Sequence, residues 1–449
     1  MKKENKKKNV IILGAGGRDF HDFLTVFKDN PKYNVVCFTA TQIPGIEKRI
    51  FPAKLAGKYY RKGVPIYPES QLKDLIKKFK IDFVILAYSD LSHQEVMEKA
   101  GIALAAGADF KLMSPEHTQL VSKKPVIAVT AVRTGAGKSP AMRNISKHLR
   151  KKGYKVAVIR HPMPYGNLQK QEVQVFKTLD DLKKHNCTFE EDEEYEPHIK
   201  NGFTVYAGVD YEKILRKAEK DAEIILWDGG NNDFSFYKPD LHICIADARR
   251  AGHEITYYPG FTNFITADTI IINKIKTAPK EDINKIVEHA KKYNPKANLI
   301  FADMEKTLDK NINLKGKKVL AIEDGPTTTH GGMSFGAAYL VAKAHGAKII
   351  DPRPYAVGSI KQVFAKFKHL TNILPAMGYN KQQIQELQET INKAKADYVL
   401  IGTPIDLRRL LKINKPAIKV NYELKEIQGN LDSVLDNFLK NKIKKSRKR

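Results

Sequence analysis

The sequence predicts an α/β fold, and three observations support this prediction. Short apolar runs of strand length alternate with amphipathic helical stretches along the whole chain, which is the pattern of parallel sheets covered by helices. The chain has 449 residues, 42% of them hydrophobic, so it can bury the cores of two or three domains. The alternation restarts after SKKP at residues 122–125, where a proline follows a charged pair as in a linker.

The first unit, residues 1–122, is expected to be a doubly wound, Rossmann-like domain. Its glycine-rich stretch LGAGGRDFH at 13–21 lies between a strand and a helix, but it lacks the last glycine of G-x-G-x-x-G, so a nicotinamide cofactor is not expected. We expect this domain to bind a ligand or a partner subunit, with Arg18 and His21 near its strand end. Its expected elements are strands from Asn9, Val35 and Ile81, a helix over 92–106 and a strand near Asp109.

A larger α/β domain is expected to follow, with a core over residues 123–310 and a completing α/β part over 311–440. The segment 168–208, which contains the acidic run EEDEEYE, is expected to be an insertion or a mobile flap over a site. Residues 441–449 are expected to form a basic tail. The strands expected here begin at Val126, Tyr154, Ala222, Leu241, Asp268, Ala297, Lys317, Ala347 and Asp397.

The composition narrows the choice of partner and compartment. The formal charge is +27, but the first eight and last ten residues carry about eleven of those charges, so we expect no specific nucleic-acid partner. The basic body also suits a small, phosphorylated substrate. No apolar run approaches the roughly 18 residues of a membrane helix, and the three separate cysteines indicate thiols in a reducing compartment. We therefore expect no membrane contact and a cytoplasmic protein.

Residues 131–140 read AVRTGAGKSP and contain the parts of a phosphate-binding loop. Such a loop needs backbone N–H groups facing phosphate oxygens, a helix directly after it, a lysine for the outer phosphates and a hydroxyl for Mg²⁺. It follows an apolar strand and precedes a helix expected over 142–151. The stretch therefore predicts a P-loop NTPase that binds ATP, or GTP, with Mg²⁺. The residues expected to bind the nucleotide are Thr134, Gly135, Ala136, Gly137, Lys138 and Ser139.

The loop departs from the usual pattern at one position. Val132 stands where the first glycine is expected. Shortened to TGAGKS, the loop resembles that of dethiobiotin synthetase and related P-loop proteins, in which the glycine next to the GK pair forms the tight turn.

A carboxylate at a neighbouring strand end is the next requirement, because it holds the metal directly or through water. Asp228 ends the apolar run IILWD, and with Ser139 it is expected to bind Mg²⁺. Gly229 and Gly230 follow and are expected to approach the γ-phosphate. Asp233 is a second, weaker candidate.

The stretch IINKIK at 271–276 resembles the NKxD motif of GTPases, but Lys276 replaces its aspartate. A lysine accepts no hydrogen bond, so guanine specificity is not supported. Asn273 and Lys274 are expected to line the base pocket, or else to form an ordinary strand end.

Basic residues gather in loops after predicted strands, which is where ligands bind in open α/β sheets. Guanidinium groups bind phosphate through paired hydrogen bonds and neutralise charge during transfer. Each residue taken alone suits a surface role equally well, whereas three such clusters favour an anionic substrate. The clusters contain Arg133, then Arg160 and His161, then Arg249, Arg250 and His253.

Several longer motifs together resemble the cyclic 2,3-diphosphoglycerate synthetase family and its relatives labelled predicted GTPases. They are VRTGAGKS, RHPMPYG, HNCTFEEDEEYEPHI, WDGGNNDFSFYKPDLHI, EDGPTTTHGGMSFGAAY and DPRPYAVGSI. The resemblance spans nearly the whole chain. It implies an ATP-dependent closure of 2,3-diphosphoglycerate into a cyclic phosphoanhydride, and it implies a homodimer.

Roles for individual residues follow from this resemblance and from the loop. The stretch EDGPTTTHGGM, at 323–333, is expected to form a second anion site, or alternatively a turn that caps a helix over 333–344. The expected catalytic residues are Lys138, Arg133, Arg160, His161 and His330, and the expected substrate-binding residues are Arg249, Arg250, His253, Thr328 and Thr329.

Two other functions stay open at this point. One is a regulatory or chaperone-type GTPase that acts on a protein partner. Such a protein needs the same phosphate loop but does not need the basic residues at the strand ends. A nucleic-acid-associated NTPase would use the basic tails. The basic strand ends favour the enzyme.

Overall fold

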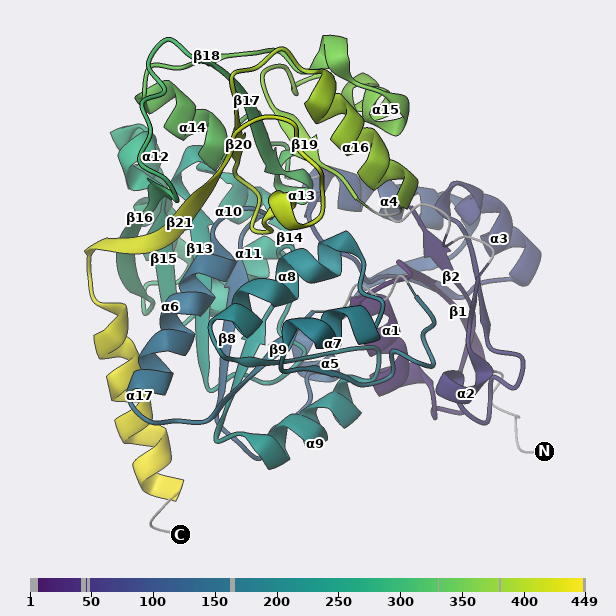
Figure 1. Ribbon diagram of the computed structural model, residues 1–449. Helices are drawn as coiled ribbons and strands as arrows, with labels where there is room; N and C mark the ends of the chain where they lie inside the picture. Colours follow the sequence, from purple (N-terminus) through teal and green to yellow (C-terminus); the bar gives the residue numbers. More distant parts are fainter. Residues whose placement is uncertain are drawn as a thin grey trace, which may run out of the picture.

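The computed structural model describes residues 7–41, 46, 49–161, 166–329, 331–378 and 381–446. His330, expected to be catalytic, and residues 162–165 of the RHPMPYG motif lie outside the described residues. The amino-terminal domain packs against one side of a larger α/β body (Figure 1). The predicted α/β class is confirmed, since parallel strands dominate both sheets.

The amino-terminal domain is a six-stranded sheet in the order β3-β4-β2-β1-β5-β7, parallel except for β3. Its central strand is apolar and buried from Val10 to Leu13, as expected for a strand covered on both faces. The strands are β1 Lys8–Leu13, β2 Tyr33–Ala40, β3 Ile50–Phe51, β4 Val64–Pro68, β5 Phe83–Leu86 and β7 Asp109–Leu112. The α-helices are α1 Arg18–Asp22, α2 Ala53–Ala56, α3 Leu72–Phe79, α4 His93–Ala106 and α5 Pro115–Thr118.

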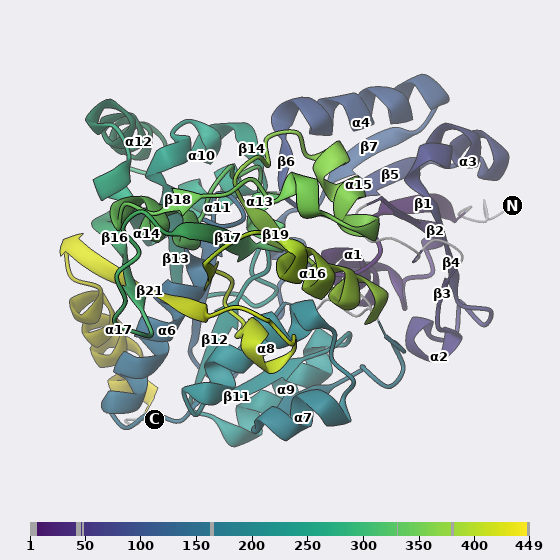
Figure 2. The same cartoon turned by 45° about the horizontal axis from the view of Figure 1, so that its top comes forward.

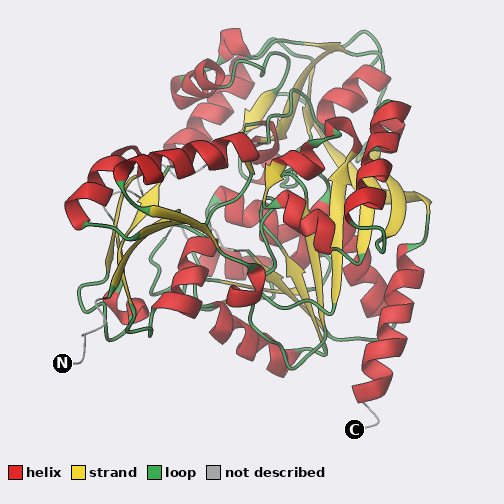
Figure 3. Cartoon of the chain, turned by 180° about the vertical axis from the view of Figure 1, so that it is seen from behind, coloured by secondary structure: helices red, strands yellow, loops and turns green. Residues whose placement is uncertain are grey.

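The remainder of the chain builds one sheet of 13 strands in the order β10-β11-β9-β12-β8-β13-β15-β16-β21-β20-β17-β18, with β19 beside β17. Figure 3 shows these strands running through the middle of the body between helices on both sides. The strands of the first half are β8 Val126–Ala131, β9 Val156–Arg160, β10 Gln174–Phe176, β11 Thr204–Ala207, β12 Ile224–Asp228, β13 Leu241–Asp247, β15 Thr269–Asn273 and β16 Asn298–Leu308.

The carboxyl-terminal half joins this sheet through the antiparallel pair of β16 and β21. Beyond that pair, β21, β20 and β17 are parallel to one another. Figure 2 shows β17 and β19 above the centre of the molecule, with α16 in front of them. The strands of this half are β17 Lys318–Asp324, β18 Lys348–Ile349, β19 Leu374–Ala376, β20 Tyr398–Ile401 and β21 Ala417–Gln428.

Helices cover the large sheet on both faces. The helix after the phosphate loop begins at Lys138, four residues before the expected start, because the loop glycines lead directly into its first turn. The expected basic tail also differs, since the last helix continues to Ser446. The helices are α6 Lys138–Lys151, α7 Leu179–Lys184, α8 Phe189–Lys200, α9 Tyr211–Asp221, α10 His253–Thr256, α11 Gly260–Thr266, α12 Lys280–Tyr293, α13 Gly325–Thr328, α14 Ala337–Ala344, α15 Gly358–Lys366, α16 Lys381–Lys393 and α17 Leu431–Ser446.

The glycine-rich loop after β1 is filled by the chain itself. The backbone N–H groups of Gly16, Gly17 and Phe20 all donate to one carboxylate oxygen of Asp19, at 2.8, 3.1 and 2.7 Å. A Cβ on Gly14 would lie 2.6 Å from the other oxygen, so this position needs glycine. A dinucleotide-type loop uses such N–H groups for phosphate. Here the buried carboxylate of Asp19 takes that place.

The helix α1, directly after this loop, packs the amino-terminal domain against the larger body. Arg18 forms an ion pair of 2.8 Å with Asp233, and both side chains are 3% exposed. The ring of His21 stacks on Phe236 at 4.2 Å. The two-stranded sheet of β6 Leu91–Ser92 and β14 Tyr257–Tyr258 crosses the same boundary. The carboxyl end of the first sheet is therefore a domain interface.

No helix among the described residues combines the length and the apolar character needed to cross a membrane.

Candidate functional site

The phosphate loop has the geometry that its sequence predicts. It joins the fully buried strand β8 to α6, and Gly137 is the residue that caps this helix. Gly135 has φ +76° and Gly137 has φ +112°, conformations that side-chain-bearing residues rarely adopt. Lys138 is 8% exposed, and its ammonium donates to the carbonyl oxygen of Asn231, just beyond β12.

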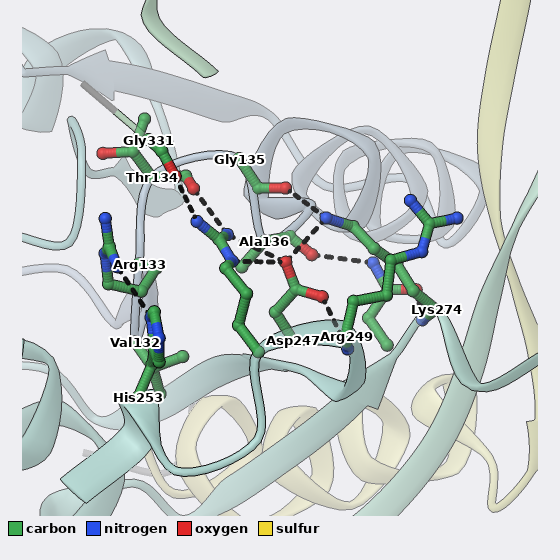
Figure 4. Close-up of polar contacts among 12 residues, drawn as sticks. Val132, Arg133, Thr134, Gly135, Ala136, Asp247, Arg249, His253, Lys274 and Gly331 are labelled. Carbon is green, nitrogen blue, oxygen red and sulfur yellow. Dashed lines mark hydrogen bonds and ion pairs between the residues drawn. The ribbon is translucent and has the colours of Figure 1, made fainter. Parts of the chain in front are cut away.

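Three side chains hold the loop from outside by its carbonyl groups. Arg250 donates to the carbonyl of Thr134 at 2.7 Å, and Asn273 donates to that of Ala136 at 2.8 Å. Lys274 donates to the carbonyl of Gly135 at 2.7 Å (Figure 4). Because these carbonyls face outward, the alternating N–H groups are left to face the inside of the loop.

Asp247 orients two of these three residues. Its carboxylate lies 2.7 Å from Lys274 and 2.8 Å from Arg250, and it is buried. Burial alone raises the pKa of Asp247, but the two cations outweigh this effect and hold it well below its usual range. Burial lowers the pKa of Lys274 to about 8 despite Asp247. Asn273 and Lys274, expected in the base pocket, thus support the phosphate loop.

A buried charge cluster lies at the end of β12. Asp228 is 0% exposed, and its carboxylate lies 2.8 Å from Arg160 and 2.9 Å from His198. Arg160 also pairs with Glu194 of α8 and donates to the carbonyls of Asp228 and Gly229. Burial raises the pKa of Asp228, but Arg160, His198 and Lys138 outweigh it and hold that pKa at about 2. The carboxylate is therefore ionised beside the phosphate loop.

The expected insertion, residues 168–208, brings a helix to this cluster. Its strands β10 and β11 extend the large sheet, and its acidic run forms most of α8. Sequence reasoning missed Glu194 and His198, which contact Arg160 and Asp228. No sequence motif links Glu194 and His198 to β12, so their contacts with Arg160 and Asp228 are seen only in the folded chain.

A pocket that is partly open to solvent lies over the phosphate loop. Three buried polar atoms of its lining residues have no hydrogen-bond partner among the described residues: Thr134 Oγ1, Arg160 Nε and His198 Nδ1. Buried polar atoms are normally paired, so these three fit a polar ligand. The charged lining residues are Lys138, Arg143, Arg160, Arg249, Lys274, Lys306, Glu194, Glu323 and Asp324.

Residues of the carboxyl-terminal half form the wall of the pocket that faces the phosphate loop. A Cβ on Gly135 would lie 2.6 Å from the side chain of Thr327, so the loop and α13 are in close contact. Thr328 and Thr329 were expected to bind substrate, and their hydroxyls donate to the carbonyl of Gly325 in their own turn, at 3.1 and 2.8 Å. Thr328 lines the pocket.

Arg133 points away from the loop. Its guanidinium lies 2.6 Å from Asp90, 2.7 Å from His253 and 3.7 Å from the ring centre of Tyr257. Figure 4 shows Arg133 and His253 together, on the other side of the loop from Lys274. Burial and the nearby arginines lower the pKa of His253 to about 4, so its neutral ring accepts from Arg133. This contact joins the loop to the amino-terminal domain.

His161 lies between the two domains. A Cβ on Gly17 or Gly230 would lie 2.7 or 2.9 Å from its ring, so the ring packs directly on both glycines. Its Nε2 is 3.4 Å from Asp233, the carboxylate that Arg18 also binds. Gly229, expected at the γ-phosphate, points its N–H to the carbonyl of Val129 at 3.4 Å.

One curated relative matches this chain over almost its whole length. "Arginine synthetase ArcE" from Thermococcus kodakarensis is 59% identical over 446 residues, covering 98% of this chain and 100% of the relative. The chain belongs to the ArcE family. The name of the ArcE relative is that of a synthetase, and the compound in this name is arginine and not a cyclic diphosphoglycerate. No family model matches the sequence.

Solved structures resemble the ArcE-family chain only distantly. LpxK from Aquifex aeolicus, solved in complex with ATP, is 13% identical, covers 82% of this chain and 99% of its own, and has a TM-score of 0.42. Cobyrinic acid a,c-diamide synthase from Mycobacterium smegmatis, with bound ADP and magnesium, is 14% identical, covers 49% of this chain and 82% of its own, and has a TM-score of 0.19.

Proposed function

We propose that this protein is a Mg²⁺- and ATP-dependent synthetase that forms arginine. The observation that carries the proposal is the identity of 59% with the arginine synthetase over 98% of the chain. The glycine-rich loop, Lys138 and Asp228 support the use of a nucleoside triphosphate. ATP is the nucleotide proposed because Lys276 stands where GTPases carry the guanine-binding aspartate.

The chemistry of the product defines the acceptor. The last C–N bond of a guanidinium group can be formed from a ureido group, as in citrulline, but a ureido oxygen is a poor leaving group. If this oxygen attacks the γ-phosphorus, the bond from phosphorus to the bridging oxygen breaks and ADP leaves. Ammonia then attacks the activated carbon, the C–O bond breaks, and phosphate leaves together with a proton.

The chain supplies positioning and charge for this transfer. Loop N–H groups and Lys138 stabilise the charge on the transferring phosphoryl group, and Arg160 adds a fixed guanidinium on the Asp228 side. Burial and the nearby Arg160 lower the pKa of Lys138, while Asp228 opposes this shift. Arg160 is held by Asp228 and Glu194, so its orientation is set before any substrate binds.

Ser139 and Asp228 are the residues that would hold Mg²⁺, although both carboxylate oxygens of Asp228 are already paired, one with Arg160 and the other with His198. Magnesium is usually bound by one or two protein oxygens together with phosphate oxygens, and no group of three His, Cys, Asp or Glu side chains placed to hold a metal occurs in the described part of the chain. Ser139 lines the pocket, and Asp228 is ionised and buried beside Lys138. When bound, Mg²⁺ would neutralise charge on the outer phosphates.

The proposal is tested by measuring product formation. With ATP, Mg²⁺, citrulline and ammonium chloride, we expect arginine to appear with one ADP and one phosphate for each arginine formed. Omitting citrulline or ammonium should abolish arginine formation. Release of phosphate without any arginine would contradict the proposal.

Cyclisation of 2,3-diphosphoglycerate is a second candidate. Six cationic side chains line the pocket against three anionic ones, which suits a substrate with several negative charges. Replacing citrulline and ammonium with 2,3-diphosphoglycerate in the same assay, with phosphorus NMR of the products, separates the two candidates. Slow hydrolysis that neither substrate accelerates would favour the regulatory or chaperone-type NTPase.

A further inference from the structure

The order of the strands fixes the direction in which a nucleotide crosses the loop. β8 lies between β12 and β13, and the sheet continues from β13 to β15, β16 and β21. Asp228, Arg160 and His198 all lie on the β12 side. If the outer phosphates face Asp228, the nucleoside must extend toward β15, β16 and β21.

The pocket continues in that direction, and its lining there contains more apolar and aromatic side chains. Its walls there are Met304 and Lys306 of β16 and Tyr422 of β21, with Met333 and Phe335 from the carboxyl-terminal half. Asn273 and Lys274 do not define this end, because their side chains are bonded to the carbonyls of the phosphate loop. An apolar and aromatic wall is the surface on which a base can stack.

Arg249 and Phe335 form the polar edge of this wall. The guanidinium carbon of Arg249 lies 5.3 Å from the ring centre of Phe335. Its Nε donates to the hydroxyl of Thr277 at 2.7 Å, and Arg249 is one of the residues that line the pocket. The pair joins η3 Ala248–Arg250, at the end of β13, to the segment before α14.

We propose that the purine base of the nucleotide binds against Phe335, Arg249 and Met304, in the part of the pocket shared by β16 and the carboxyl-terminal half. This inference rests on the proposed function and names a site for the part of ATP that the phosphate loop does not contact. The base stacks on the wall, and the terminal nitrogens of Arg249 donate to acceptors on the base or ribose. Nucleotide binding thereby joins both halves of the large sheet.

The experiment compares two ligands that share the phosphates. Binding of Mg-ATP and of magnesium tripolyphosphate is measured by calorimetry for the wild-type protein, Phe335→Ala and Phe335→Trp. We expect Phe335→Ala to weaken ATP binding by about tenfold and to leave tripolyphosphate binding unchanged. Phe335→Trp, which keeps an aromatic surface, should retain wild-type preference for ATP.

A matched control is Tyr293→Ala, which removes an aromatic ring that is 37% exposed on α12, outside the pocket. It should bind both ligands as the wild type does. Unchanged ATP affinity in Phe335→Ala would overturn the base site, and so would equal affinities of the wild type for ATP and tripolyphosphate. Wild-type protein that binds neither ligand would remove the phosphate site and the base site together.

Discussion

In the proposed mechanism, Lys138 is the residue on which phosphoryl transfer depends most directly. Replacing it with alanine removes the one charge that reaches the outer phosphates from within the loop. We expect kcat for ATP turnover to fall by about 10²- to 10³-fold, with an unchanged circular dichroism spectrum. Lys147→Ala is the matched control, because Lys147 lies on the same helix with its side chain 42% exposed. Normal turnover by Lys138→Ala would refute the site.

Gly137 is a residue whose backbone conformation the site requires. Alanine at this position would be strained at φ +112°, and its Cβ would overlap the amide of Asn273. Gly107→Ala carries comparable strain at φ +98°, with open space around the new Cβ. We expect Gly137→Ala to abolish Mg-ATP binding in calorimetry and Gly107→Ala to preserve it. Equal affinities would mean that the loop does not contact the phosphates.

Single-residue roles divide into those that a sequence can reveal and those that it cannot. The strand, turn and helix around the loop glycines and Lys138, and the strand that ends at Asp228, could be predicted because these elements leave fixed spacings in the chain. Arg133 was expected at the phosphates, yet it binds Asp90, and Asn273 binds a loop carbonyl. Side-chain direction at a strand end depends on partners far away in the sequence, so no local pattern encodes it.

The short helix α1 carries a buried carboxylate that titrates near neutral pH. Asp22 is 1% exposed, and neither of its oxygens has a hydrogen-bond partner among the described residues. Burial raises the pKa of Asp22 to about 8. The unfolded value is about 3.9, so the stability that this group contributes is greatest below pH 4 and is lost as the pH rises toward 8.

Asp22→Asn should remove this dependence. We expect its free energy of unfolding, measured by urea denaturation, to exceed that of the wild type by more at pH 8 than at pH 5. The gain is at most about 1.4 kcal/mol per pH unit. His21 and Asp19 titrate in both proteins, so the difference isolates Asp22. The same difference at both pH values would contradict the raised pKa.

Elements with strong apolar character were the most predictable from the sequence. Every strand expected from an apolar run is present in the sheets, because buried parallel strands need such runs. The unrecognised features include the long strand β21, the short strands β10 and β11 at one end of the large sheet, and the helical form of the acidic run in α8. The second half of β21, which pairs with β16 in antiparallel fashion, contains several charged residues. A search for apolar runs therefore does not detect this strand.

The whole molecule depends on a buried ion pair between its two domains. Arg18 and Asp233 are both 3% exposed. Arg18→Met leaves Asp233 buried without its main partner, which should cost about 3–5 kcal/mol in the free energy of unfolding. The double variant Arg18→Met/Asp233→Asn should recover part of this loss. Arg353→Ala is the control, since its ion pair is exposed and should cost under about 1 kcal/mol.

The most direct measurement of the central claim is a calorimetric titration of the wild-type protein with ATP, with and without Mg²⁺. The claim is that the loop from Gly135 to Ser139 binds the phosphates beside an ionised Asp228. It predicts one site per chain, with an affinity that falls markedly when magnesium is withheld. No binding heat with Mg-ATP, or the same affinity with and without magnesium, would contradict it.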